Sequence, residues 1–161
     1  MRPIKDPAVI ADIANWIKYV SETKTSNNWA VCPYAHKAKM DQQVKIFHYN
    51  FIQLDQIVNE FTADDQTFKV WVFICDSKFN VEKEAKTLNN WYHDVVWLWD
   101  IADQSGNIDG TLTGNGKHNL LLLQDRNELI KMSDTIKERG YYSNWTKSYY
   151  DQIVSWRKNA H

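Results

Sequence analysis

Short apolar runs determine what kind of fold this chain can adopt. The stretch TFKVWVFIC, residues 67–75, is almost entirely apolar and rich in β-branched and aromatic side chains, as is typical of a central strand covered on both faces. VVWLWDIA (95–102) and NLLLLQ (119–124) are predicted as two further strands. All of these runs are far shorter than the roughly 20 apolar residues that cross a bilayer. The sequence therefore predicts a soluble protein built around a sheet.

The remaining segments predict one more strand and several helices. QVKIFHYNF (43–51) alternates in polarity and is predicted as a strand. Residues 6–22 are predicted as a helix that Asp6 caps and Pro7 begins. Asn80 is expected to cap a second helix, and Asp125 with Glu128 a third that stops at Gly140. A short helix follows the strand at 43–51, and a final helix carries on one face Trp145, Tyr149, Ile153 and Trp156.

The order α-β-α-β-α-β-β-α-α favours one α/β domain over residues 1–161. We expect a two-layer sandwich of about four mixed strands with helices packed on the sheet, ferredoxin-like or similar. The crossovers between parallel strands are expected to be right-handed.

Composition limits the classes of partner. The 19 Lys and Arg residues balance 20 Asp and Glu residues at a pI near 6.5, so no general nucleic-acid or acidic-membrane binding is expected. The start of the chain has no apolar signal region, which predicts a reducing cytoplasm and two free thiols, with a Cys32–Cys75 disulfide as the alternative. Aromatic residues make up 14% of the chain. They either fill the core or form a pocket wall or a partner surface.

The segment CPYAH is the first candidate site. If Pro33 begins a helical turn, Cys32 and His36 converge near its N-terminus, where a thiolate is favoured. The alternative is a buried loop cysteine beside a solvated histidine. Cys32, His36 and His48 also form a candidate transition-metal set, although the close ligand pairs of structural zinc are missing. Cys75 is expected to be structural and buried, behaving as a small hydrophobe.

The third strand supplies the second candidate site. Trp97 and Trp99 face the same way and either stack a planar ligand together with His118 or cover a helix. Asp100 lies on the opposite face, at the carboxyl end of the strand, where ligand crevices of open α/β sheets form. The glycine-rich segment 103–118 departs from the phosphate-binding loop pattern in spacing and in His118. It is expected to be a loop or hairpin that covers a site.

The tryptophan-bearing helix followed by WAVCPYAHKA resembles a family of uncharacterised bacterial proteins in which a W-L helix leads into L-C-P-F-A-K. The resemblance covers about the first 50 residues. Cys32, Pro33 and Ala35 match the family's positions, Tyr34 replaces its phenylalanine and His36 its lysine. The composition also resembles that of marine viral proteins. The resemblance implies a fold and marks Cys32 and Pro33, but it implies no reaction.

Two functions follow from these patterns. The first is a thiol- or metal-dependent enzyme or redox protein with a site around Cys32 and His36. The alternative is a non-catalytic interaction module, such as a viral accessory or structural protein, that uses Trp- and Tyr-rich surfaces. The partner is accordingly a small molecule or another protein.

Overall fold

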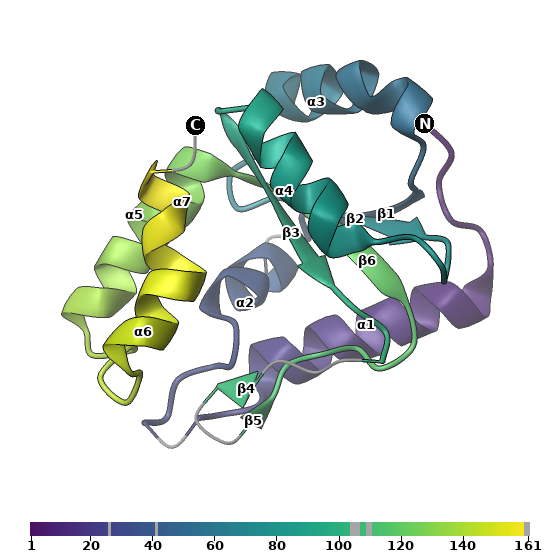
Figure 1. Cartoon of the computed structure of the whole chain (residues 1–161). Helices are drawn as coiled ribbons and strands as arrows, with labels where there is room; N and C mark the ends of the chain where they lie inside the picture. Colours follow the sequence, from purple (N-terminus) through teal and green to yellow (C-terminus); the bar gives the residue numbers. More distant parts are fainter. Residues whose placement is uncertain (26, 41, 104–106, 109–110, 160–161) are drawn as a thin grey trace.

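The computed structural model describes residues 1–25, 27–40, 42–103, 107–108 and 111–159. Four strands form one mixed sheet in the order β1-β2-β6-β3 (Figure 1). Its strands are β1 Val44–His48, β2 Val70–Cys75, β3 Val95–Asp100 and β6 Asn119–Asp125. A small hairpin, β4 Asn107–Ile108 with β5 Thr111–Leu112, precedes β6. The predicted α/β class and the four mixed strands are confirmed, and the hairpin lies in the segment predicted to hold one.

The helices begin where local signals place them. Their bounds are α1 Pro7–Glu22, α2 Pro33–Met40, α3 Leu54–Ala63, α4 Val81–Trp91, α5 Arg126–Glu138, α6 Lys147–Tyr150 and α7 Trp156–Asn159. The side chains of Asp6, Asn80 and Asp125 accept the hydrogen bonds of N-caps, as predicted. Among the described residues, no helix is long and apolar enough to cross a membrane.

Helices cover both faces of the sheet, so the expected two-layer sandwich is wrong and the protein has three layers. Alternate residues of β2 enter two different cores: Trp71 and Phe73 pack with α3 and α4, whereas Val70 and Val72 pack with α1, α2 and α5. Figure 1 shows α3 and α4 together, away from α1. The apolar pattern of 67–75 indicated burial on both faces, but it did not indicate how the helices divide between them.

The strand order also differs from the expected ferredoxin-like arrangement. β1 pairs parallel to β2, and β6 pairs antiparallel to both β2 and β3. In the sheet, β6 lies between β2 and β3, so the connection from β2 to β3 crosses over β6. Both crossover helices, α3 and α4, lie on the same face, and each crossover moves in the same direction across the sheet. The two crossovers consequently share one hand.

The C-terminal segment differs from the single amphipathic helix predicted for it. A π-helical stretch, Asp151–Ser155, separates α6 from α7. This stretch changes the register, so that Trp156 packs on the core while Trp145 and Tyr149 pack against each other, 4.8 Å apart between ring centroids. All three aromatic residues are partly buried. These aromatic residues therefore pack against one another and on the core, and they do not form one exposed surface.

Asn89 of α4 hydrogen-bonds the outer edge of β3. Its Nδ2 donates to the carbonyl oxygen of Trp97 over 2.9 Å, and its Oδ1 accepts from the Trp97 amide over 2.8 Å. Asn89 is buried and Trp97 is fully buried. A buried polar group without a partner costs about 1–3 kcal/mol, so this pair of bonds makes a large contribution to joining α4 to the sheet.

Replacing Asn89 should destabilise the fold strongly. Asn89→Ala leaves the amide and the carbonyl of Trp97 buried without these partners, so we expect a loss of about 2 kcal/mol in the free energy of unfolding. The measurement is urea denaturation followed by tryptophan fluorescence. Asn90→Ala is the matched control, because Asn90 is the exposed neighbour on the same helix. Equal losses in the two variants would contradict this role of Asn89.

Candidate ligand-binding pocket

Asp100 anchors the turn that precedes β6. Its Oδ2 accepts hydrogen bonds from the Asn115 amide, over 2.8 Å, and from the Asn115 side chain. Burial raises the pKa of the Asp100 carboxyl above its usual value, and the two hydrogen bonds from Asn115 oppose that rise. Asp100 lies at the carboxyl end of β3, as predicted. Asp100 is partly buried, and its bonds to Asn115 fix the chain segment between β5 and β6 to the end of β3.

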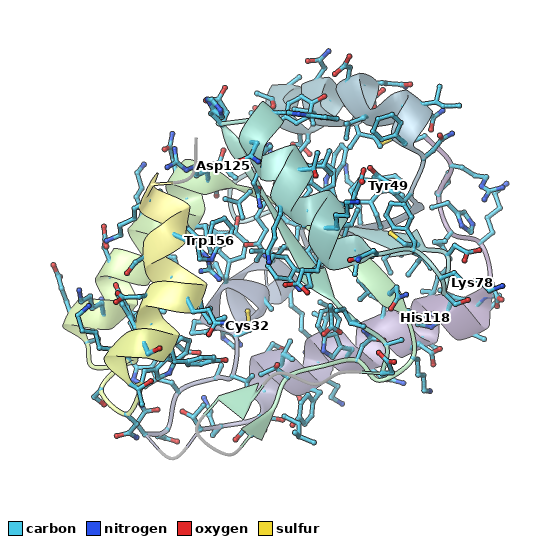
Figure 2. All side chains as sticks on the ribbon, in the orientation of Figure 1. Cys32, Tyr49, Lys78, His118, Asp125 and Trp156 are labelled. Atoms are coloured by element: carbon cyan, nitrogen blue, oxygen red, sulfur yellow. The ribbon has the colours of Figure 1, made fainter. Side chains whose placement is uncertain are left out.

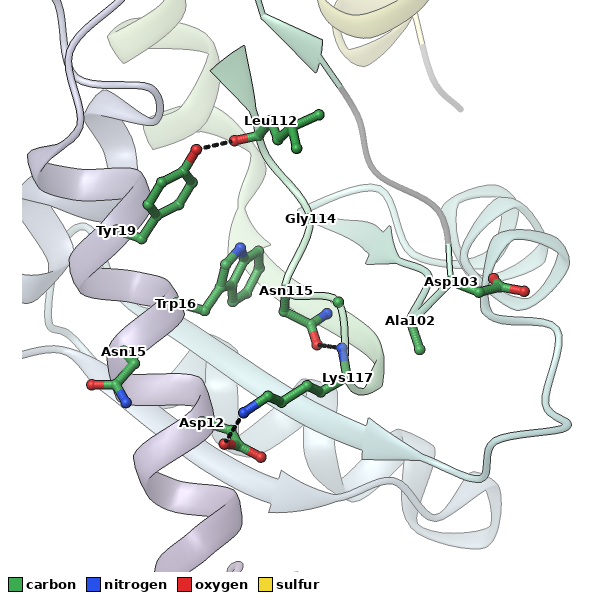
Figure 3. Close-up of a pocket in the computed structure, with 11 residues that line it drawn as sticks. Asp12, Asn15, Trp16, Tyr19, Ala102, Asp103, Leu112, Gly114, Asn115 and Lys117 are labelled. Atoms are coloured by element: carbon green, nitrogen blue, oxygen red, sulfur yellow. Dashed lines mark hydrogen bonds and ion pairs between the residues drawn. The ribbon is translucent and has the colours of Figure 1, made fainter.

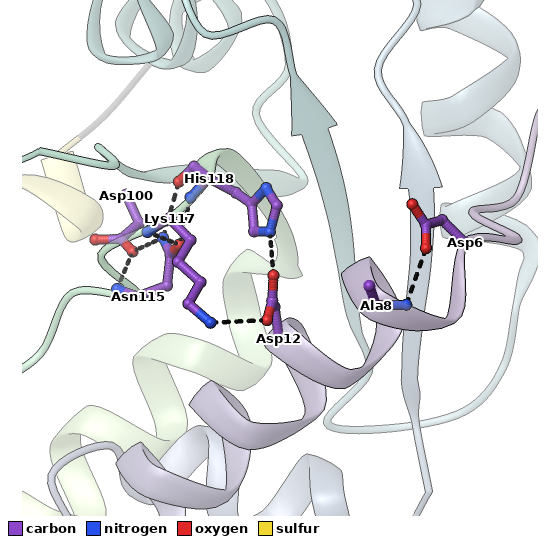
Figure 4. Close-up of polar contacts among 7 residues, drawn as sticks. All are labelled: Asp6, Ala8, Asp12, Asp100, Asn115, Lys117 and His118. Atoms are coloured by element: carbon purple, nitrogen blue, oxygen red, sulfur yellow. Dashed lines mark hydrogen bonds and ion pairs between the residues drawn. The ribbon is translucent and has the colours of Figure 1, made fainter.

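Asn115 shapes this turn. Its Oδ1 accepts from the amides of Lys117, over 2.9 Å, and His118, over 2.6 Å, while its Nδ2 donates to the His118 carbonyl over 2.8 Å. Gly116 between them has φ +74°, in the left-handed region that glycine adopts without strain. The turn thus directs the side chains of Lys117 and His118 towards α1 (Figure 4).

Both side chains reach one carboxylate, that of Asp12 in α1. His118 Nε2 lies 2.9 Å from Asp12 Oδ2, and Lys117 Nζ lies 3.0 Å from Asp12 Oδ1. Hydrogen bonds from these two side chains lower the pKa of Asp12 below its usual value, and the bond from His118 contributes most. Asp12 is therefore held ionised.

A pocket of about 520 Å³ opens between α1 and this connection (Figure 3). Trp16 Nε1 donates to the Thr113 carbonyl and the Tyr19 hydroxyl donates to the Leu112 carbonyl, each over 2.8 Å, so that α1 holds the hairpin end of the connection. The pocket is lined by Asp12, Asn15, Trp16, Tyr19, Ala102, Asp103, Leu112, Gly114, Asn115, Gly116 and Lys117. Several residues of the segment 103–118, which was predicted to cover a site, line this pocket; 104–106 and 109–110 lie outside the described residues, and the predicted role stays a prediction.

The structure brings together two of the residues that the sequence singled out separately. Asp100 and His118 meet through Asn115. The sequence analysis missed Asp12, Asn15 and the pocket role of Trp16. A signal for them was present, because Asp12, Asn15, Trp16 and Tyr19 are spaced three and four apart and share a face of α1.

Cys32 and His36 lie near the start of α2, but they point to different surroundings. Cys32 directly precedes α2 and contacts the core between α1 and α2. His36 is exposed, and its Nδ1 lies 3.2 Å from the Ser21 carbonyl oxygen. Burial raises the pKa of the Cys32 thiol, opposed by the amides of Ala35 and Tyr34 and by Arg157. Pro33 does begin a helix, yet this surrounding favours the neutral thiol. Figure 2 shows Cys32 well separated from His118.

The proposed metal set is not assembled. Among the described residues, no group of three or more His, Cys, Asp and Glu side chains is placed to hold a metal ion. His48 lies at the end of the edge strand β1, whereas Cys32 and His36 lie at α2. Both cysteines are free. Cys75 is partly buried, and burial raises its pKa to about 12.

The two tryptophans of β3 take the second of their predicted roles. Trp97 is fully buried and Trp99 partly buried, both in the core between the sheet and the helices α3 and α4. Lys86 Nζ lies 5.7 Å from the centre of the Trp99 ring. This placement indicates that the indoles cover a helix, and the Trp97 ring has no surface on which a planar ligand can stack.

The pocket at α1 is the candidate site in which the structure brings the largest number of polar and aromatic side chains together. Comparisons with protein-family models, with curated proteins and with solved structures found no match to the chain. The functional inference consequently depends on the chemistry of the residues in the pocket.

The interaction between His118 and Asp12 predicts a measurable pKa change. In His118→Ala, Asp12 loses the hydrogen bond that contributes most to its lowered pKa, so the pKa of Asp12 should rise towards its usual value. The measurement is the pH titration of the Asp12 side-chain carbonyl by carbon-13 NMR. His93→Ala, which alters an exposed histidine outside this turn, should leave the titration unchanged. An unchanged pKa in His118→Ala would show that the pair does not form in solution.

The surroundings of Cys32 predict slow thiol chemistry. In a Cys75→Ala background, alkylation of Cys32 by iodoacetamide should have a pH midpoint above the free-thiol value of about 8.5, because burial disfavours the thiolate. The rate should increase sharply when the protein is unfolded in urea. A midpoint below the free-thiol value would instead support the activated-thiol hypothesis.

Proposed function

We propose that this protein binds a small polar molecule in the pocket at α1, with Asp12 as the anchoring acceptor. The observation that carries the proposal is the Asp12 carboxylate at the wall of the pocket, where His118 lies 2.9 Å and Lys117 3.0 Å from its oxygens and fix its position. A fixed carboxylate accepts hydrogen bonds from hydroxyl or amino groups more strongly than a neutral acceptor does. The proposed ligand therefore carries such donors.

The other lining residues support this class of ligand. Trp16 and Tyr19 provide aromatic surface, while Asn15, Asp103 and Asn115 provide further polar groups. Apolar walls with a few convergent polar groups are the usual composition of ligand sites, and a volume of about 520 Å³ lies within their usual range.

The charges in the pocket favour a neutral or cationic ligand. Lys117 is the basic residue in the lining, and its ammonium is paired with Asp12, while Asp103 adds a second carboxylate. A phosphate-binding site normally offers unpaired Arg or Lys side chains or converging backbone amides. We therefore do not expect a phosphorylated molecule to be the preferred ligand of this pocket.

The test measures the nitrogen-15 NMR signal of the indole N–H of Trp16, a residue of the pocket wall. The signal is assigned by its absence from the spectrum of Trp16→Phe. We expect glucose or ethanolamine to shift this nitrogen-15 NMR signal in a saturable way, and inorganic phosphate to leave it in place. Asp12→Asn should weaken the binding about tenfold or more, because the charged acceptor is lost. Asp134→Asn, an exposed acid on α5, is the matched control. Equal binding by wild type and Asp12→Asn, or preferential binding of phosphate, would refute the proposal.

The hypothesis of thiol- or metal-dependent chemistry around Cys32 and His36 stays a prediction. Its support is the position of Cys32 directly before α2, where the amides of Tyr34 and Ala35 oppose the effect of burial on the thiol. The alkylation experiment above distinguishes it from the pocket proposal, because the two sites share no residue.

A further inference from the structure

A second surface lies on the opposite side of the sheet, over α3 and α4. Three large apolar side chains are exposed there: Ile52 at 91%, and Phe51 and Trp91 at 55% each. The rings of Phe51 and Trp91 lie 6.3 Å apart between centroids. These residues come from the turn before α3 and from the end of α4, and they form one patch. We call Phe51, Ile52 and Trp91 the apolar patch.

A groove continues from this patch along α3. It has a volume of about 600 Å³ and is lined by Val58, Asn59, Thr62, Ala63, Trp91, Tyr92, His93, Asp94 and Val95. Trp91 belongs to both the patch and the groove, so the two form a continuous surface. Beside them, the Tyr92 hydroxyl donates to Asp55, which joins α3 to the end of α4.

The two chain segments that form this surface carry mostly acidic residues. The sequence has Asp55, Glu60, Asp64 and Asp65 but no Lys or Arg between Lys45 and Lys69. On the other wall, it has no Lys or Arg between Lys86 and Lys117, whereas Asp94 lines the groove. Lys45 and Lys69 both contact Asp64 at the far end of α3. Asp55, Glu60 and Asp94 are exposed; Asp94 lines the groove, and Asp55 and Glu60 belong to α3, which forms one wall of it.

The geometry points to a docking site for a basic segment of another protein that carries apolar side chains, and we propose this as the second binding surface of the molecule. Exposed aromatic and aliphatic side chains around a groove are typical anchors of an interface. Acidic residues at the rim select a partner of opposite charge and increase its association rate. This surface shares no residue with the pocket at α1, so the proposal does not depend on the proposed small-molecule function.

The test uses synthetic peptides in fluorescence anisotropy with the whole protein. A labelled peptide built from Leu-Lys-Lys-Leu units should bind, and added salt should weaken the binding. A Leu-Glu-Glu-Leu peptide and a Gly-Lys-Lys-Gly peptide should each bind at least about tenfold more weakly, because one lacks the positive charge and the other the apolar anchors.

Matched variants locate the binding. Ile52→Ser should weaken binding of the Leu-Lys-Lys-Leu peptide about tenfold without lowering Tm, because Ile52 is 91% exposed. Ile10→Ser, at an exposed isoleucine of α1 that lies outside the proposed pocket, should leave binding of the peptide unchanged. The double variant Asp55→Asn with Glu60→Gln should reduce the dependence of binding on salt.

Three results would overturn the proposal. The first is equal affinity for the Lys and Glu peptides, and the second is an affinity that Ile52→Ser does not change. The third is sedimentation of the wild type as a dimer that Ile52→Ser converts to a monomer, since a second copy of this chain would then occupy the surface.

Discussion

The burial of β6 between two antiparallel neighbours is the constraint on which the rest of the structure depends. Leu120 and Leu122 enter the core below α1, α2 and α5, and Leu121 and Leu123 enter the core below α3 and α4. One strand therefore holds both outer layers to the sheet. Because β6 runs against β3, its first residues lie beside the last residues of β3. This pairing brings the turn at Asn115 to Asp100 and hence His118 to Asp12.

Local signals in the sequence predicted the elements better than their arrangement. Asp6, Asn80 and Asp125 cap helices through side-chain bonds to amides two or three residues away, so short-range chemistry was enough to place them. The strand order depends on the insertion of β6 between β2 and β3, two strands that precede it in the sequence. No local sequence pattern encodes this insertion. Likewise, Asp100 and His118 were identifiable one at a time, but Asp12 joins His118 across 106 positions of the chain. Pro33 predicted the start of a helix, whereas the direction of the His36 ring depends on the carbonyl of Ser21 in another helix.

The sheet separates the pocket at α1 from the apolar patch and its groove. The pocket lies between α1 and the connection to β6, and the apolar patch with its groove lies over α3 and α4. Figure 1 shows α1 away from these two helices. The polar pocket presents a carboxylate that its neighbours hold ionised, whereas the groove combines apolar anchors with an acidic rim. The two proposals therefore concern ligands of different size and chemistry. Nothing in their lining residues forces the two ligands to compete, since no residue is common to both.

Each edge of the sheet has backbone groups that are already hydrogen-bonded within the chain. At the β3 edge, Asn89 occupies the amide and the carbonyl of Trp97. At the β1 edge, the N-terminal segment does the same: the Ile4 amide donates to Ile46, and the His48 amide donates to the Arg2 carbonyl. Open edges invite strand addition and the growth of aggregates. In a chain this rich in β-forming aromatic residues, the occupied groups of Ile46, His48 and Trp97 make the addition of a strand at these positions unfavourable.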